Sequence, residues 1–305
     1  MGGYILKRLG LALLVALAVS AASFLLLRLS GDVALAIAGE GARTEDVELV
    51  RKTYGLDRPL IVQYGEWLVR TLSGDFGQSL YFKTPVLGLI LDKIGVTVVL
   101  ALASLALALA VSMPLGILAA LYPNTWIDRL SLVLAVAGQA LPNFFFALVL
   151  VIIFSIKLRW LPVSGSESWA HFVLPTVALG FYIAPPFMRL IRTGMIEVLA
   201  SDYIRTARAK GLSSRSVVLK HALRNALVPV VALAAVQLGF LLGGSIVIES
   251  IFALDGLGNL AYQSITHKDV PVTQAVLLIL SAAYVFLTLA ADLVNAWVDP
   301  RLRVA

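Results

Sequence analysis

The sequence predicts an all-α membrane protein that crosses the bilayer six times. Hydrophobic residues make up 60% of the 305 residues and charged residues only 14%, against about 45–50% and about 25% in soluble domains. The mean hydropathy is +0.92. This composition excludes a disordered chain and argues against a soluble globule. The sequence contains no cysteine, which rules out disulfides and thiolate metal sites.

Six apolar runs each reach the length of roughly 20 residues that a helix needs to cross the hydrocarbon layer. They cover residues 9–27, 96–121, 130–156, 172–190, 226–248 and 272–298. The first run resembles a signal peptide in having Lys7 and Arg8 before it. Its apolar core is longer than the usual 7–15 residues of a signal peptide, so we interpret it as a retained span. Several prolines are expected to kink or break spans, namely Pro114, Pro142, Pro175, Pro185 and Pro186.

The distribution of Lys and Arg predicts that both termini lie in the cytoplasm. Short loops on the cytoplasmic side of membrane proteins carry an excess of basic residues. With the N-terminus inside, thirteen basic residues fall inside and only Lys157, Arg159 and Lys268 fall in the short outer loops. The long outer segment, residues 29–95, has seven basic and nine acidic residues, so its charges nearly cancel. The thirteen are Lys7, Arg8, Arg129, Arg189, Arg192, Arg205, Arg208, Lys210, Arg215, Lys220, Arg224, Arg301 and Arg303.

The outer segment is expected to contain two helices. Thr44 can cap the first, and Gly55 can end it. The second can begin at Pro59, a residue favoured at the first helical position. Its apolar residues recur at helical spacing, which predicts an amphipathic helix on the membrane surface or against the spans: Leu60, Ile61, Tyr64, Trp67, Leu68 and Leu72. A structural lid and a partner-docking surface are both open interpretations of this segment.

The basic segment between the fourth and fifth spans is expected to form an elbow of two short helices. Ser201 can cap the first helix, Asp202 suits its first turn, and Gly211 can end it. Ser213 or Ser214 can cap the second. One interpretation is a basic loop that rests on anionic lipid, and the other is a projecting contact for a partner protein. A nucleic-acid site is disfavoured, because no aromatic residues alternate with the charges.

Two stretches of this elbow resemble a known family. The run from Asp202 to Gly211, followed by the run from His221 to Pro229, is similar to the cytoplasmic loop of ABC importer permeases, specifically the oligopeptide, dipeptide and nickel branch. In the wider superfamily this loop reads Glu-Ala-Ala, three residues and then Gly. Here Arg205 stands at the Glu position, and Thr206 and Ala207 stand at the Ala positions, a departure that fits the peptide branch.

Further stretches along the chain resemble the same branch. They are residues 54–60 with 74–77, 249–252 with 256–258, 269–272, and 299–301. Asp255 stands where the family usually has Pro before Gly-Leu-Gly, and Ser30-Gly31-Asp32-Val33 replaces the usual Pro-Gly-Asp-Pro. These two departures leave the detail of the outer gate open.

The resemblance implies a type I importer permease in the bacterial cytoplasmic membrane. It divides the chain into an N-terminal span with its outer segment, residues 1–95, and a five-helix core, residues 96–305, whose coupling loop covers about 192–225. It implies a non-catalytic subunit with four kinds of partner: a second, different permease, two ATP-binding subunits, an extracytoplasmic substrate-binding protein and membrane lipid. No cofactor is expected in this chain, because ATP and magnesium would bind to the ATPase subunits.

The resemblance also implies which residues contact the ATPase. Apolar contact is expected from Tyr203, Ile204 and Ala207, and pairing with acidic residues from Arg205 and Arg208. The complete set expected in the coupling helix is Tyr203, Ile204, Arg205, Thr206, Ala207, Arg208, Ala209 and Gly211.

Other functions leave traces that the sequence mostly lacks. There is no Gly-x-x-x-x-Gly-Lys-Ser/Thr, no His-Glu-x-x-His and no Gly-x-Ser-x-Gly, which disfavours an ATPase, a zinc protease and a membrane hydrolase. A gradient-driven carrier needs an intramembrane charge, and Asp292 is the best candidate, although pairing with a neighbouring helix is the competing interpretation. The candidate pathway or gate residues are Gln139, Asn143, Gln237, Glu249 and Asp292. Peptides are the favoured substrate, with nickel, a sugar or another small solute as alternatives.

Overall fold

The computed structural model describes residues 2–29, 31–39 and 41–298. The sequence predictions at Ser30, Arg301 and Arg303, and the 299–301 stretch, lie outside these residues. All regular elements in the described ranges are helical, apart from one isolated antiparallel bridge between Gln78 and Pro85. Within the described residues, four helices are long and apolar enough to cross a membrane, or up to six if each of two bent helix pairs is one span. The all-helical membrane fold is thus confirmed.

The four unbroken candidate spans are α1 (Gly2–Leu29), α5 (Val86–Leu121), α8 (Ala170–Leu199) and α15 (Val270–Val298). Three of them extend well beyond the predicted runs, α1 and α5 at their starts and α8 at its end. The reason is that hydropathy marks only the apolar part of a helix, whereas the backbone continues through polar turns. Pro114 lies inside α5, and Pro175, Pro185 and Pro186 lie inside α8. The expected break is therefore wrong at these prolines, whose freed backbone groups neighbouring helices can satisfy.

The third predicted span is bent at Pro142. The run 130–156 is divided into α6 (Trp126–Ala140), α7 (Asn143–Leu150) and the π-helical η1 (Val151–Lys157), and the two halves meet at 99°. Pro142 disfavours helical backbone at the preceding residue, and Leu141 is accordingly extended, with φ −85° and ψ 123°. The kink or break expected at Pro142 is therefore confirmed.

The fifth predicted span is also bent. The short helices α10 (Ser214–Ser216), η2 (Val217–Ala222) and α11 (Leu223–Ala226) lead into α12 (Val228–Gly244), with a bend of 51° between the two halves. After α12 the chain turns through α13 (Ile246–Ile251) and α14 (Leu257–Thr266) before α15. Two short helices therefore occupy the connection between the last two spans.

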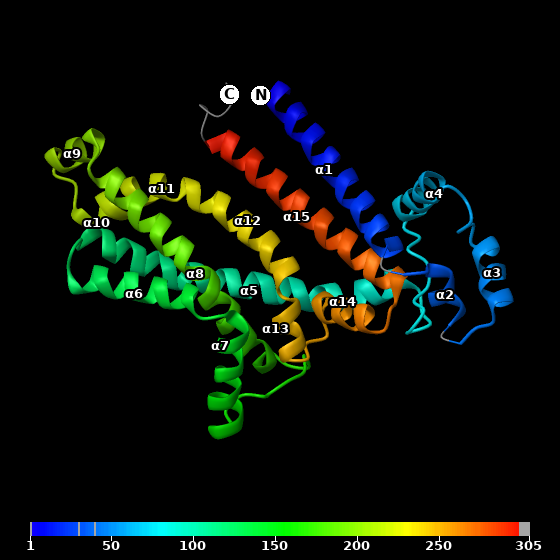
Figure 1. The fold of residues 1–305 in the computed structure, drawn as a ribbon. Helices are drawn as coiled ribbons and strands as arrows, with labels where there is room; N and C mark the ends of the chain where they lie inside the picture. Colours follow the sequence, from blue (N-terminus) through cyan, green and yellow to red (C-terminus); the bar gives the residue numbers. More distant parts are fainter. Residues whose placement is uncertain (1, 30, 40, 299–305) are drawn as a thin grey trace.

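The core of the molecule lies around α8, against which α5, α6 and α7 pack (Figure 1). Phe187, Ile191 and Met195 of α8 are fully buried. Two glycines allow the neighbouring helices to approach closely. A Cβ atom on Gly116 of α5 would lie 2.9 Å from Ile191, and one on Gly138 of α6 would lie 2.8 Å from Pro185. Small residues at such crossings are typical of packing between membrane helices.

The first and the last helix of the described residues, α1 and α15, lie side by side. Figure 1 shows α1 beside α15, with the N-terminus and the end of α15 at the same edge, and the two helices are in contact. Arg8 of α1 donates to Asp292 of α15 at 2.7 Å. The elbow helix α9 (Asp202–Ala209) lies at the far left of this view. The small helices α2 (Val33–Ala38), α3 (Thr44–Thr53) and α4 (Leu60–Leu72) gather at the opposite end of α1.

The two helices expected in the outer segment are present as α3 and α4. Gly55 follows α3 with φ +64°, and Pro59 directly precedes α4. The predicted cap is wrong by one residue, because Arg43 holds the N-cap position, without a side-chain hydrogen bond, and Thr44 lies in the first turn. Tyr64 and Trp67 of α4 pack around the buried ring of Phe24, with ring centroids 5.5 and 5.8 Å away. The helix α4 is therefore held against α1 by aromatic contacts.

Candidate functional site

The elbow, residues 201–226, begins with α9. Its first helical residue is Asp202, and Ser201 occupies the N-cap position. The Ser201 hydroxyl does not cap the helix; it donates instead to the Val198 carbonyl at 2.5 Å. Gly211 ends the first arm with φ +78°, and its N–H donates to the Arg208 carbonyl at 2.9 Å. The turn therefore has the left-handed residue that the sequence predicts, because glycine adopts this conformation without a steric penalty.

The inner face of α9 is part of the chain's own core. Ile204 is 0% exposed and Ala207 is 8% exposed, and both pack in the same cluster as Met195, Val217 and Ala222. The expectation that Ile204 and Ala207 provide apolar contact to a partner is therefore wrong, since side chains buried in this way are covered already. They anchor α9 to α8 and to the second arm of the elbow.

The outer face of α9 carries the remaining expected contact residues. Arg205, Thr206, Arg208 and Ala209 are exposed, and Tyr203 is 45% exposed. Arg205 donates to Asp202 one turn earlier at 3.2 Å, with both side chains largely in solvent. Exposed pairs of this kind add little stability. The helix α9 therefore has an exposed basic face and a buried apolar face.

The second arm is held by a side-chain cap and by its own buried face. The Ser213 hydroxyl accepts from the Ser216 N–H at 3.4 Å, which confirms the expected cap. Val217, Ala222 and Ala226 are buried. The side-chain amide of Asn225 donates to the Tyr203 hydroxyl at 2.7 Å and to the His221 carbonyl at 3.3 Å. The bond to Tyr203 joins the second arm of the elbow to the first.

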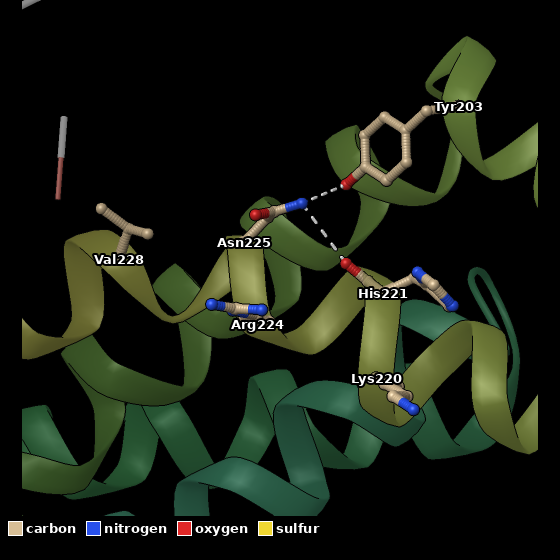
Figure 2. Close-up of a pocket in the computed structure, with 6 residues that line it drawn as sticks. All are labelled: Tyr203, Lys220, His221, Arg224, Asn225 and Val228. Atoms are coloured by element: carbon tan, nitrogen blue, oxygen red, sulfur yellow. Dashed lines mark hydrogen bonds between the residues drawn. The ribbon is translucent and has the colours of Figure 1, made fainter. Parts of the chain in front are cut away.

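A polar cavity of about 500 Å³ opens between the two arms. Figure 2 shows its lining, with Asn225 between Tyr203 and the His221 carbonyl. The lining residues are Tyr203, Lys220, His221, Arg224, Asn225 and Val228. No acidic side chain is among them, so the cavity is electropositive.

A bidentate ion pair between Asp128 and Arg192 joins α6 to α8. Arg192 donates through Nε to Asp128 Oδ1 at 2.6 Å and through a terminal nitrogen to Asp128 Oδ2 at 2.8 Å. The Asp128 side chain is 4% exposed and that of Arg192 is 25% exposed. The Asn124 N–H also donates to Asp128, at 2.9 Å. Such paired geometry is the stronger kind of charged hydrogen bond. This pair could not be predicted, because nothing in the sequence links residues 64 positions apart.

Glu249 lies at the centre of a buried cluster that we call the Glu249 knot. The side chain is 0% exposed. Its Oε1 accepts from the hydroxyls of Thr97 at 2.9 Å and Ser245 at 2.7 Å. Its Oε2 accepts from the backbone N–H groups of Gly258 at 2.7 Å and Asn259 at 3.1 Å. The carboxylate therefore joins α5, α13 and the first turn of α14, where the helix dipole also favours a negative charge.

The knot explains the Gly-Leu-Gly stretch beside it. A Cβ atom on Gly256 would collide with Glu249 and Thr97, and one on Gly258 would lie 2.8 Å from Ile246. The Leu257 N–H, between them, donates to Thr97 at 2.8 Å. The two glycines are therefore needed because the backbone of α14 approaches the carboxylate closely.

Two acidic residues near the knot are also paired. Asp255 forms an ion pair with Lys93 of α5, so the residue that departs from the family pattern contacts the start of a span. Asp269 is fully buried and accepts from the Ser79 hydroxyl at 2.5 Å and from the Leu80 and Tyr81 N–H groups, both at 3.2 Å. This second buried carboxylate fastens the end of the outer segment to the start of α15.

The candidate pathway residues are spread over five elements, and no hydrogen bond or ion pair is found between any two of them within the described ranges. Gln139 of α6 accepts from Arg189 at 2.8 Å. Asn143 is the first residue of α7 and Gln237 lies in α12, both half-buried. Asp292 is paired with Arg8, as the competing interpretation expected. Glu249 is enclosed in its knot, and a role in a pathway or gate stays a prediction for all five.

Within the described residues no three His, Cys, Asp or Glu side chains lie together as a metal site would require. The elbow itself combines the exposed basic face of α9 with the cavity between its two arms. The Glu249 knot lies apart from it, at the connection of α13 and α14.

Comparison with known proteins gives matches along the whole chain. Residues 112–304 match the family described as "Binding-protein-dependent transport system inner membrane component". Residues 1–101 match its companion, described as "Binding-prot-dependent transport system membrane comp, N-term". The glutathione transport system permease protein GsiC of Escherichia coli K12 is 42% identical over 301 residues, which are 98% of both chains. The protein of the same name from Salmonella typhimurium LT2 has the same identity and coverage.

The fold also resembles a solved transporter. An inward-facing structure of the MetNI methionine ABC transporter aligns with a TM-score of 0.56 at 20% sequence identity. The alignment covers 69% of this chain and 96% of that chain. At this identity the likeness concerns the fold, and it supports the type I importer permease architecture.

Proposed function

This chain belongs to the family of inner membrane components of binding-protein-dependent transport systems, and on that premise we propose that it imports small peptides with the help of separate ATPase subunits. It is a multi-pass permease subunit of an ABC importer in the bacterial inner membrane and forms part of the translocation pathway. The proposal concerns its substrate, its partners and its orientation.

The peptide substrate is supported by the relatives. The GsiC proteins are permeases of glutathione transport systems, and glutathione is a tripeptide. Identity of 42% extends over 98% of both chains, so the likeness covers the spans as well as the elbow. Nickel or another small solute is the alternative substrate in the same kind of system.

The elbow is proposed as the contact with an ATPase subunit. The observation that carries this proposal is the division of α9 into two faces, with Ile204 and Ala207 anchored inside and Arg205 and Arg208 exposed. A short helix anchored in this way moves as a body with α8 when a partner shifts it. Its exposed cations suit acidic residues of the partner. ATP and magnesium would then bind to the ATPases and not to this chain.

The remaining parts of the proposed assembly follow from the same premise. A second, different permease would complete the pathway, and an external binding protein would deliver the substrate. The elbow and both termini would face the cytoplasm, as the excess of Lys and Arg in those segments suggests. A stand-alone gradient-driven carrier has less support, because Asp292, its best candidate charge, is paired with Arg8.

Transport by the reconstituted system tests the proposal. Affinity purification of this chain from its native membrane, after cross-linking, should recover a second permease and two ATPases. Proteoliposomes of that complex, with the binding protein outside and ATP inside, should take up labelled glutathione or a dipeptide. Uptake without ATP by this chain alone, or ATP-driven uptake of nickel and not of peptide, would contradict the proposed mechanism or the proposed substrate, respectively.

A further inference from the structure

The cavity of the elbow contains charges that the rest of the chain does not balance. Its volume of about 500 Å³ is within the range of about 300–1,000 Å³ that ligand pockets have. Lys220 and Arg224 lie one helical turn apart, a spacing at which like charges repel each other. Neither forms an ion pair with any described residue. An anion in the cavity would relieve this repulsion.

The cavity is also formed in advance. The Asn225 amide is held by the Tyr203 hydroxyl at 2.7 Å and by the His221 carbonyl at 3.3 Å. Figure 2 shows Lys220, His221 and Arg224 on the second arm, with their side chains on different sides of it, and Tyr203 on the first arm. The lining offers an ammonium, a guanidinium and an imidazole group, and a phosphate has several oxygens that can accept from such donors.

One wall of the cavity leads onto an apolar helix surface. Val228 lines the cavity and begins α12. Val231 and Val236, which are 47% and 37% exposed, follow on the adjoining faces of the same helix. A cationic cavity joined to an apolar helix surface has the two parts that a phospholipid requires, one for its headgroup and one for its acyl chain.

We propose that this cavity binds the phosphate group of an anionic phospholipid, whose acyl chain lies along α12. The inference rests on the proposed function in one respect, since the proposed orientation places the elbow at the cytoplasmic leaflet, where such lipids meet basic side chains. The lipid would hold the two arms of the elbow at a constant depth and neutralise Lys220 and Arg224.

Binding of phosphatidylglycerol to the purified importer complex tests the proposal. Native mass spectrometry of the complex in detergent would count the lipids retained as phosphatidylglycerol is titrated. Phosphatidylcholine, a zwitterion whose net charge is zero, is the comparison. The test variant is Lys220→Gln with Arg224→Gln. Its matched control is Lys210→Gln with Arg215→Gln, which removes the same charge from exposed residues of the elbow that do not line the cavity.

The test variant should bind phosphatidylglycerol at least about tenfold more weakly, since two charge-assisted contacts are lost. The control should change by less than about twofold, because exposed charges away from the cavity act only through the screened field. Equal losses in both variants would overturn the proposal, because they would indicate a diffuse basic surface and not a site.

Two further outcomes also decide against the lipid. If inorganic phosphate at physiological ionic strength displaces phosphatidylglycerol completely, the cavity is a site for free phosphate. If the test variant alone loses its ATPase subunits while its lipid count stays constant, the cavity is a protein contact. None of these measurements requires transport. A failed peptide-uptake experiment can therefore be distinguished from failure of the lipid site.

Discussion

The elbow and the Glu249 knot both place charged side chains around short helices, and they use the charge in opposite ways. The Glu249 carboxylate accepts four hydrogen bonds and is completely buried. The cations of the elbow are exposed, and Lys220 and Arg224 have no acidic partner among the described residues. The Glu249 carboxylate is satisfied within this chain, whereas the proposed function gives the elbow cations their partners outside it. Changes in the knot should affect folding, and changes in the elbow should affect binding and coupling.

The largest effect is expected from Glu249→Ala. The variant leaves the N–H groups of Gly258 and Asn259, and the hydroxyls of Thr97 and Ser245, without their acceptor. Loss of several buried hydrogen bonds to a charge should lower the free energy of unfolding by at least about 3 kcal/mol. Thermal unfolding of the purified complex would measure this loss. The unfolding temperature of Glu249→Gln should lie between those of Glu249→Ala and the parent protein. An unchanged unfolding temperature for Glu249→Ala would contradict the structural role of the knot.

A somewhat smaller loss is expected from Arg192→Ala. The variant leaves the Asp128 carboxylate buried without its cation, which costs about 3–5 kcal/mol for fully buried pairs. Because Arg192 is 25% exposed, water can replace part of the interaction, and we expect about 2 kcal/mol. The double variant Asp128→Asn with Arg192→Gln removes both charges and should recover part of the loss. Double-mutant analysis of unfolding would show no coupling if the pair were unimportant.

Gly211→Val should lower the folding stability only slightly and reduce the coupling of uptake to ATP hydrolysis more strongly. The residue has φ +78° and open space around it, so the cost is conformational and about 1–2 kcal/mol. Relaxing this strain should tilt α9, so that ATP hydrolysis continues and uptake falls. Gly211→Asn is the matched control, because asparagine tolerates the left-handed conformation. Normal uptake per ATP hydrolysed in the valine variant would exclude a coupling role for this turn.

Arg205→Glu with Arg208→Glu should leave the fold intact and weaken the assembly. Both residues are exposed, so the unfolding temperature should stay within experimental error. Binding of the ATPase subunits should weaken, mainly through slower association and with a strong dependence on salt. Surface plasmon resonance at two salt concentrations would measure this. If the charge reversal instead destabilises the isolated permease pair, the proposed contrast between elbow and knot is wrong.

The smallest effect is expected at an exposed pair in the outer segment. Asp32 caps α2 by accepting from the Ala34 N–H at 2.9 Å, and Arg51 donates to it at 2.6 Å. The hydrogen bond from Arg51 holds the pKa of Asp32 below its usual value. The stabilisation is therefore present above the unfolded-state pKa of about 3.9 and is lost as the pH falls through the lower folded-state pKa.

Hydrogen exchange of α2 measured against pH would test this pair. Exchange should accelerate only on acidification, and Arg51→Gln should move the transition to higher pH. A transition that is unchanged in Arg51→Gln would show that Arg51 does not hold the pKa of Asp32 down. In that case the Asp32 carboxylate would not be stabilised by a partner within the chain, as the Glu249 carboxylate is.

Features that depend on a few neighbouring residues could be predicted from the sequence. Six apolar runs indicated the candidate spans, because crossing hydrocarbon requires a continuous apolar length. Gly55 and Gly211 indicated helix ends, and both have positive φ. The elbow, its Ser213 cap and the resemblance to importer permeases followed from the same local stretches. Each of these features is a property of chain segments shorter than about thirty residues.

Features that depend on packing could not be predicted in this way. Pro142 bends a span while Pro185 and Pro186 lie within an unbroken helix, and only the neighbouring helices distinguish these cases. Ile204 faces inward instead of toward a partner, because α9 folds back onto the core. Thr97 meets Glu249 across 152 residues. Local periodicity does not predict such contacts, because they form only when distant helices pack and exclude water. The physical role of Glu249 and its neighbouring glycines is therefore visible only in the folded chain.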